Sequence, residues 1–437
     1  MVMFRNWAGN QSIVPAEVRT PASAEEVARA VREGARAGRR VRMTGSGHSF
    51  TGVALSDGLL MRPDALTGIV EASGDRVTVA AGTTLRALNA ELARRGLALA
   101  NLGDIDAQTV AGAVQTGTHG TGRDVGGLAD QVVALEMVLA DGRTVRVAAD
   151  GDGTVADGVS ERDLFDAARV GLGALGVLTS VTFRVEPAFL LHQVREPMSL
   201  DALLDSLDEI VDGVEHFDAH WLPHTDTCLV KRNNRHPGPA APRNPLLRRL
   251  EVDFLENTAF GAACALGARV PRAIPLINRV SARLLSRSST VDAAHRVFVT
   301  SRKVRFLEME YAIPREHLAP ALRELRALID RSGWTISFPV EIRVAPPSDA
   351  WLSTAYGRPT AYIACHTYRP TPNPAYFAAA EEIMVGLGGR PHWGKLHTRD
   401  AAYLATVYPR LADFAALRDR LDPGRVFTNP YLDTVLG

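Results

Sequence analysis

The stretch that decides the fold is Arg40-Val-Arg-Met-Thr-Gly-Ser-Gly-His48-Ser-Phe-Thr51. Its approach over 41–43 predicts a short strand, which runs into Thr44-Gly-Ser-Gly47. Two glycines in such a loop can take positive φ angles and leave amide N–H groups bare, and His48 follows directly. The loop is therefore suited to cradle a pyrophosphate and to hold one imidazole against whatever the pyrophosphate carries.

Two other interpretations compete for this loop. The Rossmann fingerprint needs its third glycine at the start of a helix that follows a strand, but Gly52 is misplaced and 53–57 does not begin a helix. A literal match over 171–176 follows a predicted helix and precedes a predicted strand, which is the reverse of the required order. The nicotinamide interpretation therefore fails on context. A simple glycine-rich turn stays open on the loop alone.

Composition restricts the class of protein. The 437 residues are 46% hydrophobic and 22% charged, which is typical of a soluble protein with one large fold or two domains. Lys+Arg and Asp+Glu balance at 49 each, which argues against a nucleic-acid or anionic-membrane binder, so membrane association is not indicated. Three cysteines without pairing or metal spacing, and an N-terminus without an apolar signal region, favour a reducing, cytoplasmic location.

The order of predicted elements indicates an α+β fold rather than strict strand–helix alternation. A capping box at 23–26 starts a helix that ends near Gly38, and short strands with hairpin chemistry follow at 59–62, 68–72 and 76–80. A helix from Thr83 or Thr84 to Arg95 and a hairpin over 131–148 come next. The character changes near Pro187, which predicts a second unit. That unit should hold helices over 246–288 and strands at 305–313, 334–344 and 360–368 of a larger antiparallel sheet.

A second glycine-threonine stretch, Gln115-Thr-Gly-Thr-His119-Gly-Thr-Gly122, lies within the same first unit. Its hydroxyls and amides suit phosphate and ribityl oxygens, so two such loops suggest one extended ligand held from two sides. A solvated turn is the alternative for this stretch alone.

Candidate reactive side chains gather in the second half. The strand period of two puts Glu341 and Arg343 on one face, where they can hold a polyol or form a plain structural ion pair. His366 falls on another predicted strand. The segment 390–397 carries His392, His397 and Lys395 without a carboxylate or thiol at metal spacing, so no metal site is predicted. Lys395 is the better candidate, as a cation near a developing oxyanion or a reduced cofactor.

The motifs together resemble the sugar-lactone and alditol oxidases of the vanillyl-alcohol-oxidase flavoprotein superfamily. The resemblance runs from residue 6 to about 432, and it rests on segments that occur in the family's order: 6–10, 44–49, 116–120, 341–343, 390–395 and 422–429. It implies a two-lobed fold with an FAD-binding domain of the PCMH type over 1–186. A substrate domain of the aldonolactone-oxidase type would span 187–437, with its tail returning to the flavin.

The resemblance also implies roles for individual residues. His48 falls where the family attaches FAD covalently through a histidyl bond to the flavin 8-methyl group. The cofactor-contacting segments would supply Thr44, Gly45, Ser46, Gly47, Ser49, Gly103, Thr109, Gly112, Thr116, Gly117, Thr118, His119, Gly120, Gly176 and Val177. Glu341, Arg343, Lys395 and His366 match catalytic positions, and the same four with Asp104 and His392 match substrate-binding positions.

The implied reaction is hydride transfer from a carbinol carbon to flavin N5, with oxygen reduced to hydrogen peroxide. Gly103 matches a position where glycine is permissive for oxygen, which favours an oxidase. Asp104 stands where alditol oxidases carry a serine, and a carboxylate there would change which hydroxyls are accepted. The segments 101–103 and 366–368 resemble the gulonolactone and arabinonolactone branch, so an aldono-1,4-lactone is the expected substrate. An alditol oxidase, a lactone dehydrogenase that uses a cytochrome or dye, and a non-catalytic relative are the alternatives.

Overall fold

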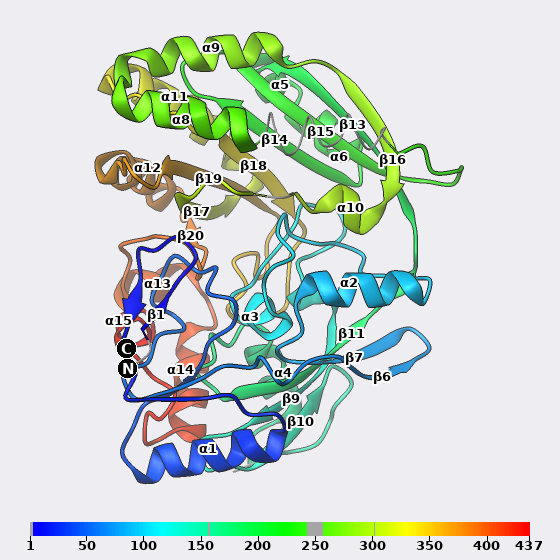
Figure 1. Ribbon diagram of the computed structural model, residues 1–437, viewed down its shortest axis with the longest axis vertical. Coiled ribbons are helices and arrows are strands. Elements are labelled where there is room, and N and C mark those ends of the chain that lie inside the picture. Colours follow the sequence, from blue (N-terminus) through cyan, green and yellow to red (C-terminus); the bar gives the residue numbers. More distant parts are fainter. Residues whose placement is uncertain (1–2, 156–157, 243–256, 301) are drawn as a thin grey trace.

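The computed structural model describes residues 3–155, 158–242, 257–300 and 302–437. Figure 1 shows a large sheet with its helices in one half of the molecule and smaller sheets in the other, with both chain ends side by side in the latter. The stretch 243–256, which includes the start of the helical region predicted over 246–288, lies outside the described residues.

The loop that carries His48 follows a small parallel sheet. The sheet consists of β3 (Glu17–Arg19), β4 (Val41–Met43) and β5 (Leu59–Met61), in the order β3-β5-β4. Helix α1 (Ala24–Arg36) lies between β3 and β4 in the chain. Ser23 caps α1 by accepting from the Glu26 amide at 3.3 Å, as the capping box predicted. The expectation of hairpin pairing for 59–62 is wrong, because β5 pairs in parallel between β3 and β4.

An antiparallel sheet completes this half. Its strands, in the order β10-β9-β11-β7-β6, are β10 (Thr144–Ala148), β9 (Val132–Val138), β11 (Val177–Arg184), β7 (Arg76–Ala80) and β6 (Ile69–Ser73). The hairpins predicted at 68–80 and 131–148 are confirmed. The helices here are α2 (Leu85–Arg94), α3 (Val110–Gln115) and α4 (Glu161–Ala168), and the short pieces are β1 (Phe4–Arg5), β2 (Ser12–Ile13), β8 (Leu97–Ala98), β12 (Glu186–Pro187) and η1 (Ala129–Gln131).

The large sheet runs β16-β13-β15-β14-β18-β19-β17-β20. Its strands are β16 (Ser288–Ala293), β13 (Leu190–Ser199), β15 (Thr227–His236), β14 (His216–Leu222), β18 (Val340–Ala345), β19 (Thr360–Tyr368), β17 (Phe306–Pro314) and β20 (Arg390–Pro391). One face packs on helices α5 (Leu200–Asp205), α6 (Leu207–Asp212), α11 (Leu318–Ser332) and α12 (Pro374–Gly386). Because side chains alternate along a strand, the other face receives the polar residues.

Two expectations for this half need correction. The strand predicted over 334–344 begins only at Val340. Pro339 lacks the amide needed to extend the ladder backwards, and the Ile336 amide donates to the ring of His224 instead. The helical region resolves into α8 (Phe260–Arg269), η4 (Pro271–Ala273) and α9 (Ile274–Leu284), and it ends in a strand, β16, that was not expected. The helix α10 (Ala294–Phe298) and η5 (Arg315–His317) complete this half.

The C-terminal helices return to the first half. Helices α13 (Ala401–Val407), α14 (Leu411–Leu421) and α15 (Pro430–Leu436) place Leu404, Phe414 and Leu432 in one core with Leu85 and Leu164. The chain end is thereby brought next to the loop that carries His48.

Candidate active site

A cavity follows the glycine-rich loop, and most of the predicted cofactor contacts line it. The lining residues among them are Gly45, Ser46, Gly47, His48, Ser49, Thr109, Gly112, Thr116, Gly176 and Val177. Five predicted contacts, Thr44, Gly103, Gly117, Thr118 and His119, are not part of this lining, and Gly120 lines a second cavity.

The walls of this first cavity fit a nucleotide cofactor. A Cβ on Gly45 would lie 2.4 Å from the Thr109 hydroxyl oxygen, so no larger residue can stand there unless Thr109 moves. The side-chain oxygen of Gln108, which lines the cavity, is buried without a hydrogen-bond partner. A buried acceptor of this kind is satisfied when a bound group brings a donor such as a ribityl or ribose hydroxyl.

His48 is held by aromatic and backbone contacts. Its ring stacks on Trp7 at 5.7 Å between centroids. The Phe50 amide donates to the Gly394 carbonyl at 2.7 Å, which ties the loop to the segment that carries Lys395. Burial, followed by the charge of Lys395, lowers the pKa of His48 to about 4. The imidazole is thus neutral near neutral pH and has a nitrogen lone pair available for bond formation.

Arg42 holds this region together, and sequence reasoning missed it. Its buried guanidinium donates to the carbonyls of Val53, Leu172, Gly173 and Phe427 at 2.5–2.9 Å. These carbonyls come from the loop, from the turn before β11 and from the C-terminal tail. The available signal was an arginine in the middle of an otherwise apolar strand.

Glu341 and Arg343 lie side by side on β18, as predicted, while Ile342 between them packs in the core. Arg343 forms ion pairs with both Glu341 and Asp104, and Arg302 forms a second pair with Asp104. Burial opposes ionisation of Glu341, but the charges of Arg343, His220 and Arg302 outweigh it and lower its pKa to about 2. The pair is therefore buried and charged, not part of a solvated face.

The neighbouring strands add polar groups that sequence reasoning did not find. The register of β14 with β18 sets His220 opposite Glu341 and Asp218 opposite Arg343. His220 lies 3.5 Å from Glu341 through Nε2 and 3.3 Å from Asp218 through Nδ1. Lys231 on β15 pairs with Asp218 at 2.9 Å. Burial is the main cause that lowers the pKa of His220 to about 4.

Two carboxylates on β17 surround Lys395, and both were also missed. Glu308 forms an ion pair with Lys395, and Glu310 lies 3.9 Å from it. His366 approaches Glu308 at 3.5 Å through Nε2, while its Nδ1 is 3.1 Å from the Pro339 carbonyl. Alternating glutamates in the run 306–313, between apolar residues that face the core, were the available signal.

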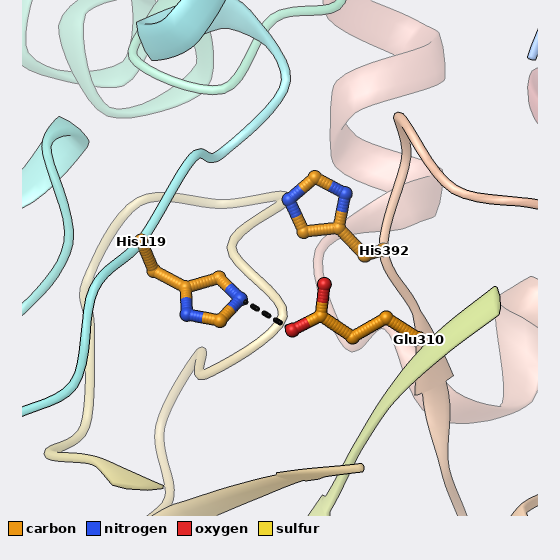
Figure 2. A group of neighbouring side chains, drawn as sticks. All are labelled: His119, Glu310 and His392. Carbon is orange, nitrogen blue, oxygen red and sulfur yellow. Dashed lines mark ion pairs between the residues drawn. The ribbon is translucent and has the colours of Figure 1, made fainter. Parts of the chain in front are cut away.

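Figure 2 shows how His119, from the second glycine-threonine loop, points at Glu310 of β17 with His392 beside them. His119 Nε2 is 3.0 Å from Glu310, and its Nδ1 is 2.9 Å from the Gly120 carbonyl. Both ring nitrogens face oxygen acceptors, so the ring joins the second glycine-threonine loop to β17 of the large sheet. His392 instead accepts from the Gly394 amide at 3.0 Å, and burial lowers its pKa to about 4.

The second cavity, of about 710 Å³, lies against this polar cluster. Its polar wall includes Asp104, Asp218, His220, Lys231, Arg302, Arg343 and His366. Its apolar wall includes Phe260, Cys264, Phe306 and Phe338. Of the predicted substrate residues, Asp104, Arg343 and His366 thus line this cavity. Glu341 contacts it through Arg343, while Lys395 and His392 are not part of its lining and lie beside Glu308 and Glu310.

Known protein families match both halves of the chain. An FAD-binding domain matches residues 15–148, and D-arabinono-1,4-lactone oxidase matches residues 181–435. The chain belongs to the D-arabinono-1,4-lactone oxidase family. It is 42% identical to an L-gulono-1,4-lactone dehydrogenase of Mycobacterium tuberculosis, over 100% of this chain and 99% of that protein. It is 34% identical to an alditol oxidase of a Streptomyces species, over 99% and 98% of the two chains.

The fold predicted from the sequence is confirmed as well. The structure matches a solvent-stable cholesterol oxidase with a TM-score of 0.81, at 19% identity, over 99% of this chain and 96% of that one. Membership of the D-arabinono-1,4-lactone oxidase family, together with its FAD-binding domain, makes the protein an FAD-dependent oxidoreductase. Within the described part of the chain, no helix has the length and apolarity needed to cross a membrane.

Proposed function

We propose that the protein oxidises a carbinol carbon of a neutral aldono-1,4-lactone, with FAD as cofactor and oxygen as acceptor, and releases hydrogen peroxide. The observation that carries this proposal is the polar wall of the larger cavity. Each of its central cations is already paired: Arg343 and Arg302 with Asp104, and Lys231 with Asp218. Such a wall offers paired hydrogen-bonding groups for hydroxyl and ring oxygens, and little unpaired positive charge for an anionic sugar acid.

FAD, when bound, accepts a hydride from the carbinol carbon and passes the electrons to oxygen. The chain's own residues bind and orient the sugar. Glu341 and Asp104 accept hydrogen bonds from hydroxyls, and Arg343 donates to the reacting oxygen as negative charge develops there. Their mutual ion pairs fix these side chains before substrate arrives, so no ordering is needed during reaction.

Lys395 supplies a second positive charge in the proposal. Glu308 and Glu310 act as positioning residues, since they hold the ammonium group on the side of the loop that carries His48. His366 presents Nε2 toward Glu308 and offers a further contact for a substrate hydroxyl.

We further propose that His48 carries FAD covalently and that residues 1–186 form the FAD-binding domain, with 187–437 as the substrate domain. The neutral ring of His48 and its place in the lining of the first cavity support the linkage. The return of α13–α15 to the first core fits the proposal that the tail reaches the flavin side.

Oxygen as acceptor rests on Gly103. A Cβ at this position would lie 3.1 Å from the Thr118 methyl group and 3.2 Å from the His119 carbonyl oxygen. Glycine therefore leaves space between the two segments that an alanine would fill. A related protein named a dehydrogenase makes a non-oxygen acceptor, such as a cytochrome, the alternative.

An alditol is the second candidate substrate, because a relative at 34% identity is named an alditol oxidase. Asp104 distinguishes the two, since its carboxylate is fixed between Arg302 and Arg343 and reaches fewer open-chain hydroxyl arrangements than a serine.

The test is oxygen uptake by the purified, flavin-loaded protein with L-gulono-, D-arabinono- and L-galactono-1,4-lactone, xylitol and sorbitol. Oxygen uptake with peroxide formation on lactones supports the proposal. Faster turnover of alditols would contradict the proposed substrate class, and dye reduction without oxygen uptake would contradict oxygen as the acceptor.

Glu341→Gln should lower kcat/KM on the best substrate by roughly a hundredfold. Glu316→Gln, an exposed glutamate in η5, is the matched control and should leave it unchanged.

A further inference from the structure

Helices α8 and α9 carry an unusual concentration of exposed apolar side chains. The exposed large apolar residues of the described chain include Leu266, Val270, Leu276, Val280 and Leu284, all within this hairpin. Leu276 and Leu284 are 63% and 77% exposed. Figure 1 shows α9 at the edge of the molecule farthest from α1, on the outside of the large-sheet half. We call residues 266–284 the outer hairpin surface.

The apolar side chains of α9 form one stripe. Leu276, Val280 and Leu284 are spaced by four residues, so they lie on one face of the helix. The opposite face is anchored, because the Asn278 side chain donates to the carbonyls of Pro223 and Ile336 at 2.9 Å each. The helix is thus fixed to the sheet half while its apolar stripe faces solvent.

The same surface is strongly cationic. Between Glu256 and Asp292 the sequence contains no acidic residue, but it contains five arginines. They are Arg269, Arg272, Arg279, Arg283 and Arg287, and all are exposed. At 100° per residue, Arg279 and Arg283 fall beside the stripe of Leu276, Val280 and Leu284. The balanced charge of the whole chain conceals this local excess, so composition gave no indication of it.

We propose that the outer hairpin surface docks the protein on the surface of an anionic phospholipid membrane. An amphipathic helix with leucine and valine on one side and flanking arginines lies in the interface, with its apolar stripe among the acyl chains and its cations at the head groups. A second copy of the chain is a poorer occupant, because a symmetric contact would place the arginine clusters against each other. Docking of this kind is peripheral and requires no membrane-spanning helix.

The test is sedimentation of the flavin-loaded protein with two kinds of vesicle, phosphatidylcholine alone and phosphatidylcholine mixed with phosphatidylglycerol. Binding to the anionic vesicles is expected, and it should weaken as salt is raised. Leu266→Ser, Leu276→Ser and Val280→Ser combined should lower the partition coefficient by about tenfold or more, and none of the three side chains lines the second cavity. Arg279→Ser with Arg283→Ser should lower it by roughly tenfold, with no apolar side chain altered.

Matched controls lie on the rest of the surface. Val18→Ser with Val70→Ser removes exposed valines, and Arg29→Ser with Arg184→Ser removes exposed arginines. Both should bind as the parent protein does. Flavin absorbance and the unfolding temperature show whether each variant is folded. If the apolar triple variant does not fold, the variant Arg279→Ser with Arg283→Ser still tests the proposal.

Three results overturn the proposal: no binding to anionic vesicles, binding that both hairpin variants retain, or loss of binding in the controls to the same extent. A dimer in solution that the apolar triple variant converts to a monomer would assign the surface to self-association and overturn it as well.

Discussion

At the scale of single residues, the site contains a line of side chains in which two glutamates alternate with a histidine and a lysine. His119, Glu310, Lys395 and Glu308 follow one another across the boundary between the cofactor loops and the large sheet. Removal of one member of such a set leaves its neighbour buried and unpaired, which costs more than the pair itself contributes. These residues therefore matter for the position of Lys395 as well as for stability.

The proposed covalent attachment of FAD can be tested at His48. In His48→Ala we expect FAD to bind without a covalent bond, because no other imidazole lines the first cavity among the described residues. The flavin should then leave the protein on acid precipitation, and turnover should fall. The measurement is flavin absorbance in the precipitate. His192→Ala, which changes an imidazole on β13, should keep the flavin in the precipitate; acid-stable flavin in His48→Ala itself would contradict the assignment.

The acceptor gives a prediction at Gly103. In Gly103→Ala the new methyl group presses on Thr118 and on the His119 carbonyl, at 3.1 and 3.2 Å. We expect the oxygen-dependent rate to fall by roughly tenfold or more. Reduction of an artificial dye by the same substrate should change little. Stopped-flow reoxidation and dye reduction measure the two separately, and an equal loss of both would show that the substitution disturbs the substrate site instead of oxygen access.

At the scale of elements, the C-terminal tail acts as a clamp on the cofactor loop. Asn429 caps α15 by accepting from the Leu432 amide, and its Nδ2 donates to the carbonyls of Gly52, Val53 and Leu55 at 2.9–3.1 Å. The single side chain therefore joins the last helix to the segment that follows His48.

Asn429→Ala should lower the free energy of unfolding by roughly 2–3 kcal/mol, since it removes a cap and the hydrogen bonds to three carbonyls, of which Val53 keeps Arg42 and Gly52 keeps the Leu55 amide as donors. It should also weaken retention of FAD. Ser199→Ala removes the cap of α5 and is the matched control, with an expected loss of about 1 kcal/mol and no effect on FAD. Urea unfolding followed by flavin fluorescence measures both; equal flavin release from the two variants would contradict the clamp.

At the scale of the whole molecule, buried neutral histidines make stability depend on pH. Burial is the main cause that lowers the pKa of His220, His392 and His397 to about 4, from a usual value of about 6.5. The unfolded chain therefore binds protons in a range where the folded chain does not. Stability from these groups is complete above about pH 6.5 and is lost as the pH falls toward 4.

We expect the unfolding temperature to drop steadily between about pH 7 and about pH 5, with roughly 1–2 kcal/mol lost per histidine. Glu308 and Glu341, whose pKa values lie at about 2, add their own loss only below about pH 4.5. Thermal unfolding across this range is the measurement. His392→Gln should flatten the decline, and an unfolding temperature that is constant down to pH 5 would show that these rings are not buried neutral.

The sequence by itself determined the local elements and the family. Capping residues fixed α1 and α2, and turn residues fixed the hairpins β6–β7 and β9–β10, because these signals lie within a few residues of one another. Glu341 and Arg343 share a face because side chains alternate along any strand. The additional site residues, by contrast, could be recognised only from the folded chain: Asp218, His220, Arg302, Glu308 and Glu310 join the predicted Asp104, Glu341 and Arg343. These contacts depend on which strands pair in the order β14-β18-β19-β17, and the pairing of β14 with β18 joins segments more than a hundred residues apart, which local sequence signals cannot specify.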